Sequence, residues 1–138
     1  MTATGLTARC GCGNLSVSVT GPPVLQVICH CMDCRSVTGD PYTEVVFFSL
    51  AGSTVHGERR AHELFGASGQ PKRYVSCTRC GEFLFGEVGV LGGVCGLRPR
   101  SLPTAFQFAP GAHVWTSQRD ATVHLDDGLP TFERAPGR

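Results

Sequence analysis

The sequence predicts a mainly β fold, with short strands, little helix and cysteine clusters suited to metal binding. Its 18 glycines and 9 prolines in 138 residues break long helices and favour tight turns. Apolar and polar residues alternate in several short segments, and no segment has a sustained helical period. Seven of the eight cysteines gather in three tight clusters. The length allows one modest core, so we expect residues 1–138 to form a single domain, ordered over about residues 6–136.

The predicted strands follow one another with Gly, Pro or polar turn residues between them. Leu15, Val17 and Val19 alternate with polar residues, as in a strand with one buried face. Residues 24–28 form a second short strand that runs into a cysteine cluster, and the tail after Thr131 is expected to be frayed. Further strands are predicted at residues 43–50, 54–56, 63–65, 73–76, 83–85, 88–91, 113–116 and 122–125.

Charge and hydropathy argue against two classes of partner. The net charge of +1 gives no broad positive field, so we expect no nucleic-acid partner. The longest apolar run, residues 45–48, is far shorter than the roughly 20 residues that cross a bilayer, so we expect no membrane partner. Residues 1–9 lack the basic patch and apolar stretch of a secretory signal, which predicts a cytoplasmic protein. In that reducing compartment, clustered thiols are more often metal ligands or redox groups than disulfides.

The first and last clusters predict a structural zinc site. Zinc takes thiolates at about 2.3 Å in a tetrahedron, so cysteines one or two residues apart on a turn reach the same ion. CGCG at residues 10–13 and CTRCG at residues 77–81 supply two such pairs, each followed by a glycine that lets the backbone fold tightly around the ion. Four thiolates fill all four coordination positions of the ion, and the free energy of metal binding then stabilises the folded protein. The predicted ligands are Cys10, Cys12, Cys77 and Cys80, with buried or disulfide-bonded thiols as the alternative.

The middle cluster, CHCMDC at residues 29–34, predicts a second zinc ion with an open position. Its three thiolates, Cys29, Cys31 and Cys34, leave the fourth place to solvent or substrate, as in catalytic sites. Such a zinc is a weak activator of water but a good host for an incoming thiol, which then reacts as a thiolate. The alternative is a closed site completed by Cys95, although Cys95 also fits a small buried residue in a glycine-rich bend.

The charged residues and histidines near the clusters have plainer interpretations. His30 lies between two ligands, where alternation turns it away from the metal, so a hydrogen-bonding or packing role is favoured. Asp33 can relay a proton but is more typical of a turn. Arg35, Lys72 and Arg73 can hold the carboxylates of a ligand, yet each alone fits a solvated surface charge. No function is assigned to His56, His62, His113 and His124, and Phe106, Phe108 and Trp115 are expected in the core.

Taken in order, the motifs resemble those of the glutathione-dependent formaldehyde-activating enzyme family, which is related to centromere protein V. The matching segments are CGCG at 10–13, CHCMDCR at 29–35, CTRCG at 77–81, HVW at 113–115 and DGLP at 127–130. The resemblance implies an Mss4-like β fold with a structural zinc on the outer pairs and a catalytic zinc on the middle cluster. It also implies a carbon–sulfur lyase-type reaction, in which glutathione or a similar small thiol adds to formaldehyde or a related small aldehyde.

Two other functions remain open from the sequence. One is a non-catalytic, zinc-binding interaction module of the same fold, which a closed middle site with Cys95 would favour. The other is a thiol redox enzyme such as a methionine sulfoxide reductase, for which Cys95 is the lone candidate nucleophile but lacks the expected flanking pattern.

Overall fold

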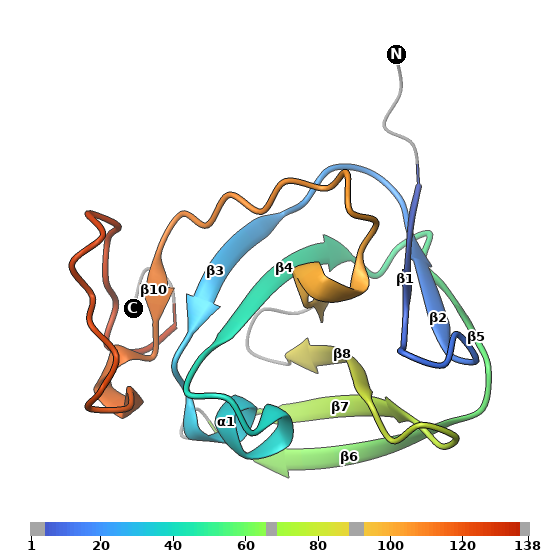
Figure 1. Cartoon of the computed structure of the whole chain (residues 1–138), viewed down its shortest axis with the longest axis horizontal. Coiled ribbons are helices and arrows are strands. Elements are labelled where there is room, and N and C mark those ends of the chain that lie inside the picture. Colours follow the sequence, from blue (N-terminus) through green and yellow to red (C-terminus); the bar gives the residue numbers. More distant parts are fainter. Residues whose placement is uncertain (1–4, 66–68, 89–92, 136–138) are drawn as a thin grey trace.

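The chain folds into two β-sheets joined by tight turns (Figure 1). The computed structural model describes residues 5–65, 69–88 and 93–135. A three-stranded antiparallel sheet contains β1 (Leu6–Arg9), β2 (Ser16–Val19) and β5 (Thr54–His56), with β2 in the middle. The larger sheet has the order β10 (His113–Val114), β3 (Leu25–Cys29), β4 (Thr43–Ser49), β9 (Val94–Leu97), β8 (Phe83–Val88), β7 (Pro71–Cys77) and β6 (Arg59–Phe65).

Helical structure is short within the described ranges. One α-helix, α1 (Met32–Thr38), follows β3, and two 3-10 turns, η1 (Pro99–Ser101) and η2 (Thr116–Gln118), lie later in the chain. All pairings in the larger sheet are antiparallel except that of β10 with β3. The prediction of a mainly β fold with little helix is therefore confirmed. Across the same ranges, no helix has the length and apolar character needed to cross a membrane.

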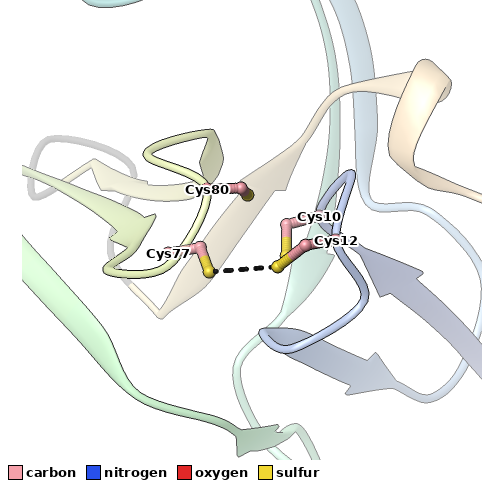
Figure 2. Close-up of side chains that lie close together, drawn as sticks. All are labelled: Cys10, Cys12, Cys77 and Cys80. Carbon is pink, nitrogen blue, oxygen red and sulfur yellow. Dashed lines mark hydrogen bonds between the residues drawn. The ribbon is translucent and has the colours of Figure 1, made fainter.

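Two turns from different sheets face each other (Figure 2). One joins β1 to β2 and carries Cys10 and Cys12, and the other follows β7 and carries Cys80. Both turns close in the same way, because Gly13 and Gly81 donate their N–H groups to the carbonyl oxygens of Cys10 and Cys77, each at 2.9 Å. Both glycines have positive φ, 78° and 76°, which side chains rarely tolerate. The tight turn expected at the glycine after each pair is therefore present.

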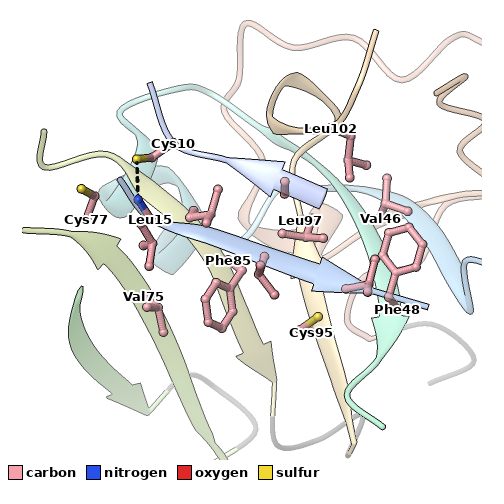
Figure 3. Packing of buried hydrophobic residues seen from close by; sticks show 14 residues of the cluster. Cys10, Leu15, Val46, Phe48, Val75, Cys77, Phe85, Cys95, Leu97 and Leu102 are labelled. Carbon is pink, nitrogen blue, oxygen red and sulfur yellow. Dashed lines mark hydrogen bonds between the residues drawn. The ribbon is translucent and has the colours of Figure 1, made fainter. Parts of the chain in front are cut away.

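The first hydrophobic core lies where the two sheets meet (Figure 3). Leu15, just before β2, and Val17 of β2 pack with Phe48, Phe85 and Leu97 from the large sheet. A second core, on the other side of β4, contains Val27, Cys29, Cys31, Phe47, Val114 and Trp115. Alternation along β4 explains both cores, since Phe48 belongs to the first and its neighbour Phe47 to the second. The large sheet is therefore covered on both faces there.

Several predicted elements change in the structure. The strand predicted at residues 122–125 is wrong, because the N–H and hydroxyl of Thr122 donate to Asp120 Oδ1 at 2.8 and 2.6 Å and bend the chain. The predicted frayed tail is wrong for residues 132–135, because the N–H of Phe132 donates to the carbonyl of His113 at 2.9 Å and the N–H of Trp115 donates to that of Arg134 at 3.0 Å. Of the strand predicted at residues 88–91, only Val88, the end of β8, lies within the described residues.

Three elements lacked a clear sequence signal. The helix α1 has only seven residues, too few for a periodic pattern, and is fixed at its ends by Cys31 and by Gly39, whose φ is 78°. The strand β1 is defined by its pairing with β2. The strand β9 includes Gly96, which was expected in a bend, but a Cβ there would lie 2.8 Å from Val45 Cγ1. That glycine permits close packing and does not mark a bend.

Candidate metal centres and their cavity

The first cysteine group brings four thiols close enough together to hold one metal ion. The Sγ atoms of Cys10, Cys12, Cys77 and Cys80 all lie within 4.8 Å of one another (Figure 2). Cys12 Sγ lies 3.6 Å from Cys10 Sγ and 3.7 Å from Cys77 Sγ, close to the separation of about 3.8 Å that tetrahedral Zn–S bonds of about 2.3 Å require. A disulfide needs about 2.05 Å, so these cysteines are free thiols suited to a metal ion.

Backbone N–H groups donate hydrogen bonds to two sulfur atoms of this group and so stabilise negative charge on them. The N–H of Leu15 donates to Cys10 Sγ and that of Arg79 to Cys77 Sγ, each at 3.3 Å. The backbone N–H groups of Cys80 and Arg79 lower the pKa of Cys77 to about 6, although burial opposes the shift. Thiolates that accept N–H bonds are the donor set that zinc prefers.

The second group is built where β3 ends and α1 begins. Cys29 is the last residue of β3, Cys31 is the N-cap of α1, and Cys34 lies in its first turn. The Sγ atoms of Cys34 and Cys29 are 3.9 Å apart, and the N–H of Cys34 donates to Cys31 Sγ at 3.3 Å. Among the described residues, no fourth His, Cys, Asp or Glu side chain joins this group within 4.8 Å. Three thiolates fit zinc and leave one coordination position without a protein ligand.

Cys95 lies in the other core. It is completely buried in β9 with the first core, where it pairs across the sheet with Phe48. Burial raises its pKa to about 11, so the thiol stays protonated at neutral pH. The expectation of a small buried residue is confirmed, and the alternative of Cys95 as a fourth ligand finds no support in this placement.

A cavity of about 70 Å³ adjoins the three-cysteine group. Its walls are mainly apolar and include Val27, Phe47 and Val114 of the second core. A cavity of about 10–15 Å³ already holds a water molecule, so this one has room for a small organic group. The cysteines of the group line the cavity together with Lys72, Tyr74 and Trp115.

Lys72 is the most unexpected residue of the cavity wall. Its interpretation as a solvated surface charge is wrong, because it is only 7% exposed. Its Nζ lies 2.9 Å from Asp33 Oδ2 and 3.8 Å from Cys31 Sγ, and 5.7 Å from the centre of the Trp115 ring. Burial alone would lower the pKa of Lys72, but the charges of Cys31 and Asp33 raise it above its ordinary value. The side chain is therefore a buried ammonium group.

Cys31 is surrounded by groups that stabilise a negative charge on its sulfur. Hydrogen bonds from Cys29 and Cys34, together with the nearby Lys72, lower the pKa of Cys31 far below its ordinary value. The hydroxyl of Tyr74 lies 3.6 Å from Cys34 Sγ, and burial raises the pKa of Tyr74 so that it stays protonated. Cys31, whose pKa is lowered, thus lies beside the ammonium group of Lys72, with its Sγ 3.8 Å from Lys72 Nζ.

Of the other polar residues considered in the sequence, Arg35 and Asp33 make tertiary contacts and Arg73 lies on the surface. Arg35 is also not a solvated charge, since it donates to the carbonyl of Gln118 at 2.7 Å and pairs with Asp120 at 3.4 Å. Asp33 stabilises Lys72 from the first turn of α1. Arg73 is exposed, as expected.

Two histidines form a buried chain behind the cysteine group. His30 Nε2 lies 2.8 Å from His113 Nδ1, and His113 Nε2 lies 2.8 Å from Asp127 Oδ2. His30 has no exposed surface, and burial, followed by the nearby His113, lowers its pKa to about 4. The predicted hydrogen-bonding role of His30 is confirmed, whereas the part played by His113 was missed.

One signal in the sequence could have identified Lys72. It precedes Tyr74 by two residues in a strand, so both side chains project from the same face of β7. If that face carries a buried tyrosine, the lysine on it is also directed inward. No comparable signal links His113 to Asp127, because the contact depends on a loop.

Comparisons with known proteins agree with the cysteine pattern. A family model described as "Glutathione-dependent formaldehyde-activating enzyme" matches residues 5–118, which confirms the resemblance inferred from the motifs. No curated protein matches the chain in sequence. A crystal structure of a structural-genomics protein from Rhodobacter sphaeroides matches with a TM-score of 0.56 and 15% identity, over 91% of this chain and 98% of that one. At that identity the likeness concerns the fold alone.

Proposed function

The chain belongs to the family of glutathione-dependent formaldehyde-activating enzymes, and from this premise we propose that it adds a small thiol to formaldehyde or a related small aldehyde. The thiol is glutathione or a close relative, and the product is its S-hydroxymethyl adduct. The observation that carries the proposal is the three-cysteine group, which has no fourth protein ligand among the described residues and borders a cavity.

We propose that both cysteine groups bind zinc and that they have different roles. Cys10, Cys12, Cys77 and Cys80 form the structural site, and Cys29, Cys31 and Cys34 form the catalytic one. A zinc ion held by three thiolates supplies the means to lower the pKa of an incoming thiol.

The chain itself contributes binding and exclusion of water. The apolar walls formed by Val27, Phe47 and Val114 favour a small uncharged aldehyde over water in the cavity. Cys29, Cys31 and Cys34 fix the direction from which a thiol approaches, because the end of β3, the N-cap of α1 and its first turn position them. We place the reaction in the cytoplasm, where low-molecular-weight thiols are kept reduced.

The test combines metal content with turnover. Protein purified without a metal-affinity tag should contain about two zinc ions, and the Cys31→Ser variant about one with its fold kept. The wild type should form the adduct from glutathione and formaldehyde above the uncatalysed rate, and the variant should not. Folded wild-type protein with two zinc ions and no acceleration would contradict the proposed reaction and leave the metal assignment intact.

A further inference from the structure

We propose that Lys72 is a further catalytic residue, whose ammonium group binds the aldehyde oxygen as that oxygen becomes negatively charged. This inference rests on the proposed function. It adds a group that neither the cysteine motifs nor the match to the family assigns, since Lys72 lies outside the metal-binding segments.

The burial of Lys72 needs an explanation, because lysine is seldom buried without a partner. A buried ammonium group loses its hydration, and that cost must be offset by nearby charges or hydrogen bonds. Asp33 offsets part of it through an ion pair of 2.9 Å, and Cys31 Sγ accepts a longer contact of 3.8 Å. A lysine has three N–H donors, and partners within the described residues account for two. The third donor is available to a ligand in the cavity.

The position of Lys72 suits the charge that develops in the reaction. It lines the same cavity as Cys29, Cys31 and Cys34, so an aldehyde attacked by a thiol held at these cysteines lies close to its Nζ. When the thiolate sulfur attacks the carbonyl carbon, a C–S bond forms and the electron pair of the C=O π bond moves to oxygen. A fixed positive charge beside that oxygen stabilises the transition state more than the neutral aldehyde.

The atoms balance with water as the only other participant. The thiol loses its proton to water on binding, and the alkoxide oxygen takes a proton from water after the C–S bond has formed. The net change is thiol plus aldehyde giving the hydroxymethyl thioether. Lys72 keeps its charge throughout and acts by electrostatic stabilisation alone.

Two neighbours position the ammonium group. Asp33 reaches it from the first turn of α1, next to the cysteine ligands in the sequence. Trp115 presents its ring 5.7 Å from Nζ, in a backbone conformation with φ of 56° that is uncommon for a residue other than glycine. These two are positioning residues. Trp115 is also the one tryptophan of the chain, so its fluorescence reports on this cavity.

The experiment compares two stable thioethers of glutathione on the zinc-loaded protein. S-carboxymethylglutathione carries a carboxylate near the place of the alkoxide, and S-carbamoylmethylglutathione is its neutral match. Binding of each is measured by the fluorescence of Trp115 in the wild type, Lys72→Met and Lys72→Arg. The control is Arg73→Met, which removes a positive charge from the adjacent exposed residue of β7.

We expect the wild type and Arg73→Met to bind the carboxylate about tenfold more tightly than the amide. Lys72→Arg should keep that preference, and Lys72→Met should lose it while retaining its zinc. The same neutral variant should lose about 100-fold in kcat/KM for adduct formation. Lys72→Gln serves as a second neutral variant. Whichever of Lys72→Met and Lys72→Gln retains its zinc shows whether the preference for the carboxylate depends on the charge of Lys72.

The outcomes separate this inference from the proposed function. An unchanged preference in a zinc-loaded neutral variant overturns the role of Lys72, even if the wild type forms the adduct. A preference that depends on Lys72 in a protein that forms no adduct supports the anion-binding group and overturns the reaction. A wild type that binds both thioethers equally overturns the inference directly.

Discussion

His113 lies in the middle of a hydrogen-bonded chain that begins at a fully buried histidine and ends at a partly exposed carboxylate. Its ring contacts His30 Nε2 on one side and Asp127 Oδ2 on the other, each at 2.8 Å. The backbone N–H of His30 also donates to the backbone carbonyl of Val114 at 3.0 Å. His30, which lies between Cys29 and Cys31, is therefore held by the strand β10 and by the loop that follows it.

Removal of His113 should destabilise the fold through its partner. In His113→Ala, the buried His30 Nε2 loses its hydrogen bond, and an unsatisfied buried polar group costs about 1–3 kcal/mol. The measurement is denaturant-induced unfolding at neutral pH. His124→Ala is the matched control, because His124 is exposed, and its stability should change by less than about 0.5 kcal/mol. Equal effects of the two substitutions would contradict a structural role for the chain of histidines.

Asp127 should make the stability depend on pH in a defined direction. The hydrogen bond from His113 lowers the pKa of Asp127 below its ordinary value of 3.8. A carboxyl group with a lowered folded-state pKa contributes stability that is fully present above 3.8 and is lost as the pH falls through the folded-state pKa. Thermal unfolding of wild type and Asp127→Asn should therefore differ at neutral pH, and the difference should shrink only as the pH falls below 3.8 and through the folded-state pKa. A difference that is the same at every pH would contradict this account.

At the scale of elements, the central strands of the large sheet leave too little space for a side chain at Gly96. Gly96 in β9 lies opposite Gly86 in β8, and both have extended backbones within the sheet. A Cβ at Gly96 would lie 2.8 Å from Val45 Cγ1 and 3.0 Å from Phe47 Cε1. At Gly86 the nearest atom would be 3.5 Å away, an ordinary contact.

This contrast predicts different costs for the same substitution. Gly96→Ala should destabilise the protein by about 1–3 kcal/mol, because Val45 and Phe47 must move from their packed positions. Gly86→Ala is the control and should cost clearly less, since its methyl group fits. Thermal unfolding measures both. The same movement of Phe47 should change the cavity, so the Gly96 variant should also weaken binding of the carboxymethyl thioether.

The helix α1 links the three-cysteine group to distant parts of the chain. The N–H of Met32 donates to Gln118 Oε1 at 2.7 Å, and Arg35 donates to the carbonyl of the same Gln118. The ion pair of Asp33 with Lys72 joins α1 to β7. A helix of seven residues has little stability of its own, so these contacts and its cysteines hold it in place.

At the scale of the whole molecule, the two cysteine groups differ in the parts of the chain that they join: the outer group joins the two sheets, and the middle group joins neighbouring elements. The outer group joins the turn after β1 in the small sheet to the turn after β7 in the large sheet, over 65 residues of sequence. The middle group lies within six consecutive residues and joins β3 only to the helix that follows it. A metal ion at the outer group therefore closes a much longer loop of the unfolded chain than one at the middle group.

Loss of the outer group should thus cost more stability than loss of the middle one. Cys12→Ser should destabilise the zinc-loaded protein by about 4 kcal/mol or more, or prevent folding, because metal binding there is coupled to folding. Cys31→Ser should leave a folded protein with one zinc ion. Thermal unfolding and metal analysis of the two variants provide the comparison. Equal stability losses would show that the outer site does not hold the sheets together.

The sequence by itself determined the β class, most strands of the large sheet and the three local clusters that contain seven cysteines. These features depend on local properties: alternation marks a buried strand face, and cysteines close in sequence on a turn must be close in space. The same locality explains the errors. The helix α1 and the strands β1 and β9 are short or glycine-rich, and their conformations are fixed by partners elsewhere in the chain.

Only the tertiary structure decided which polar residues belong to the site. Lys72 reads as a surface charge until β7 places it beside Asp33 and Cys31, which come from a segment about 40 residues earlier. His113 has no partner in its own segment, and Cys95 is assigned to a core only by its strand neighbours. Burial and long-range charge pairs depend on how strands pack in space, and a local pattern of residue types carries no record of that packing.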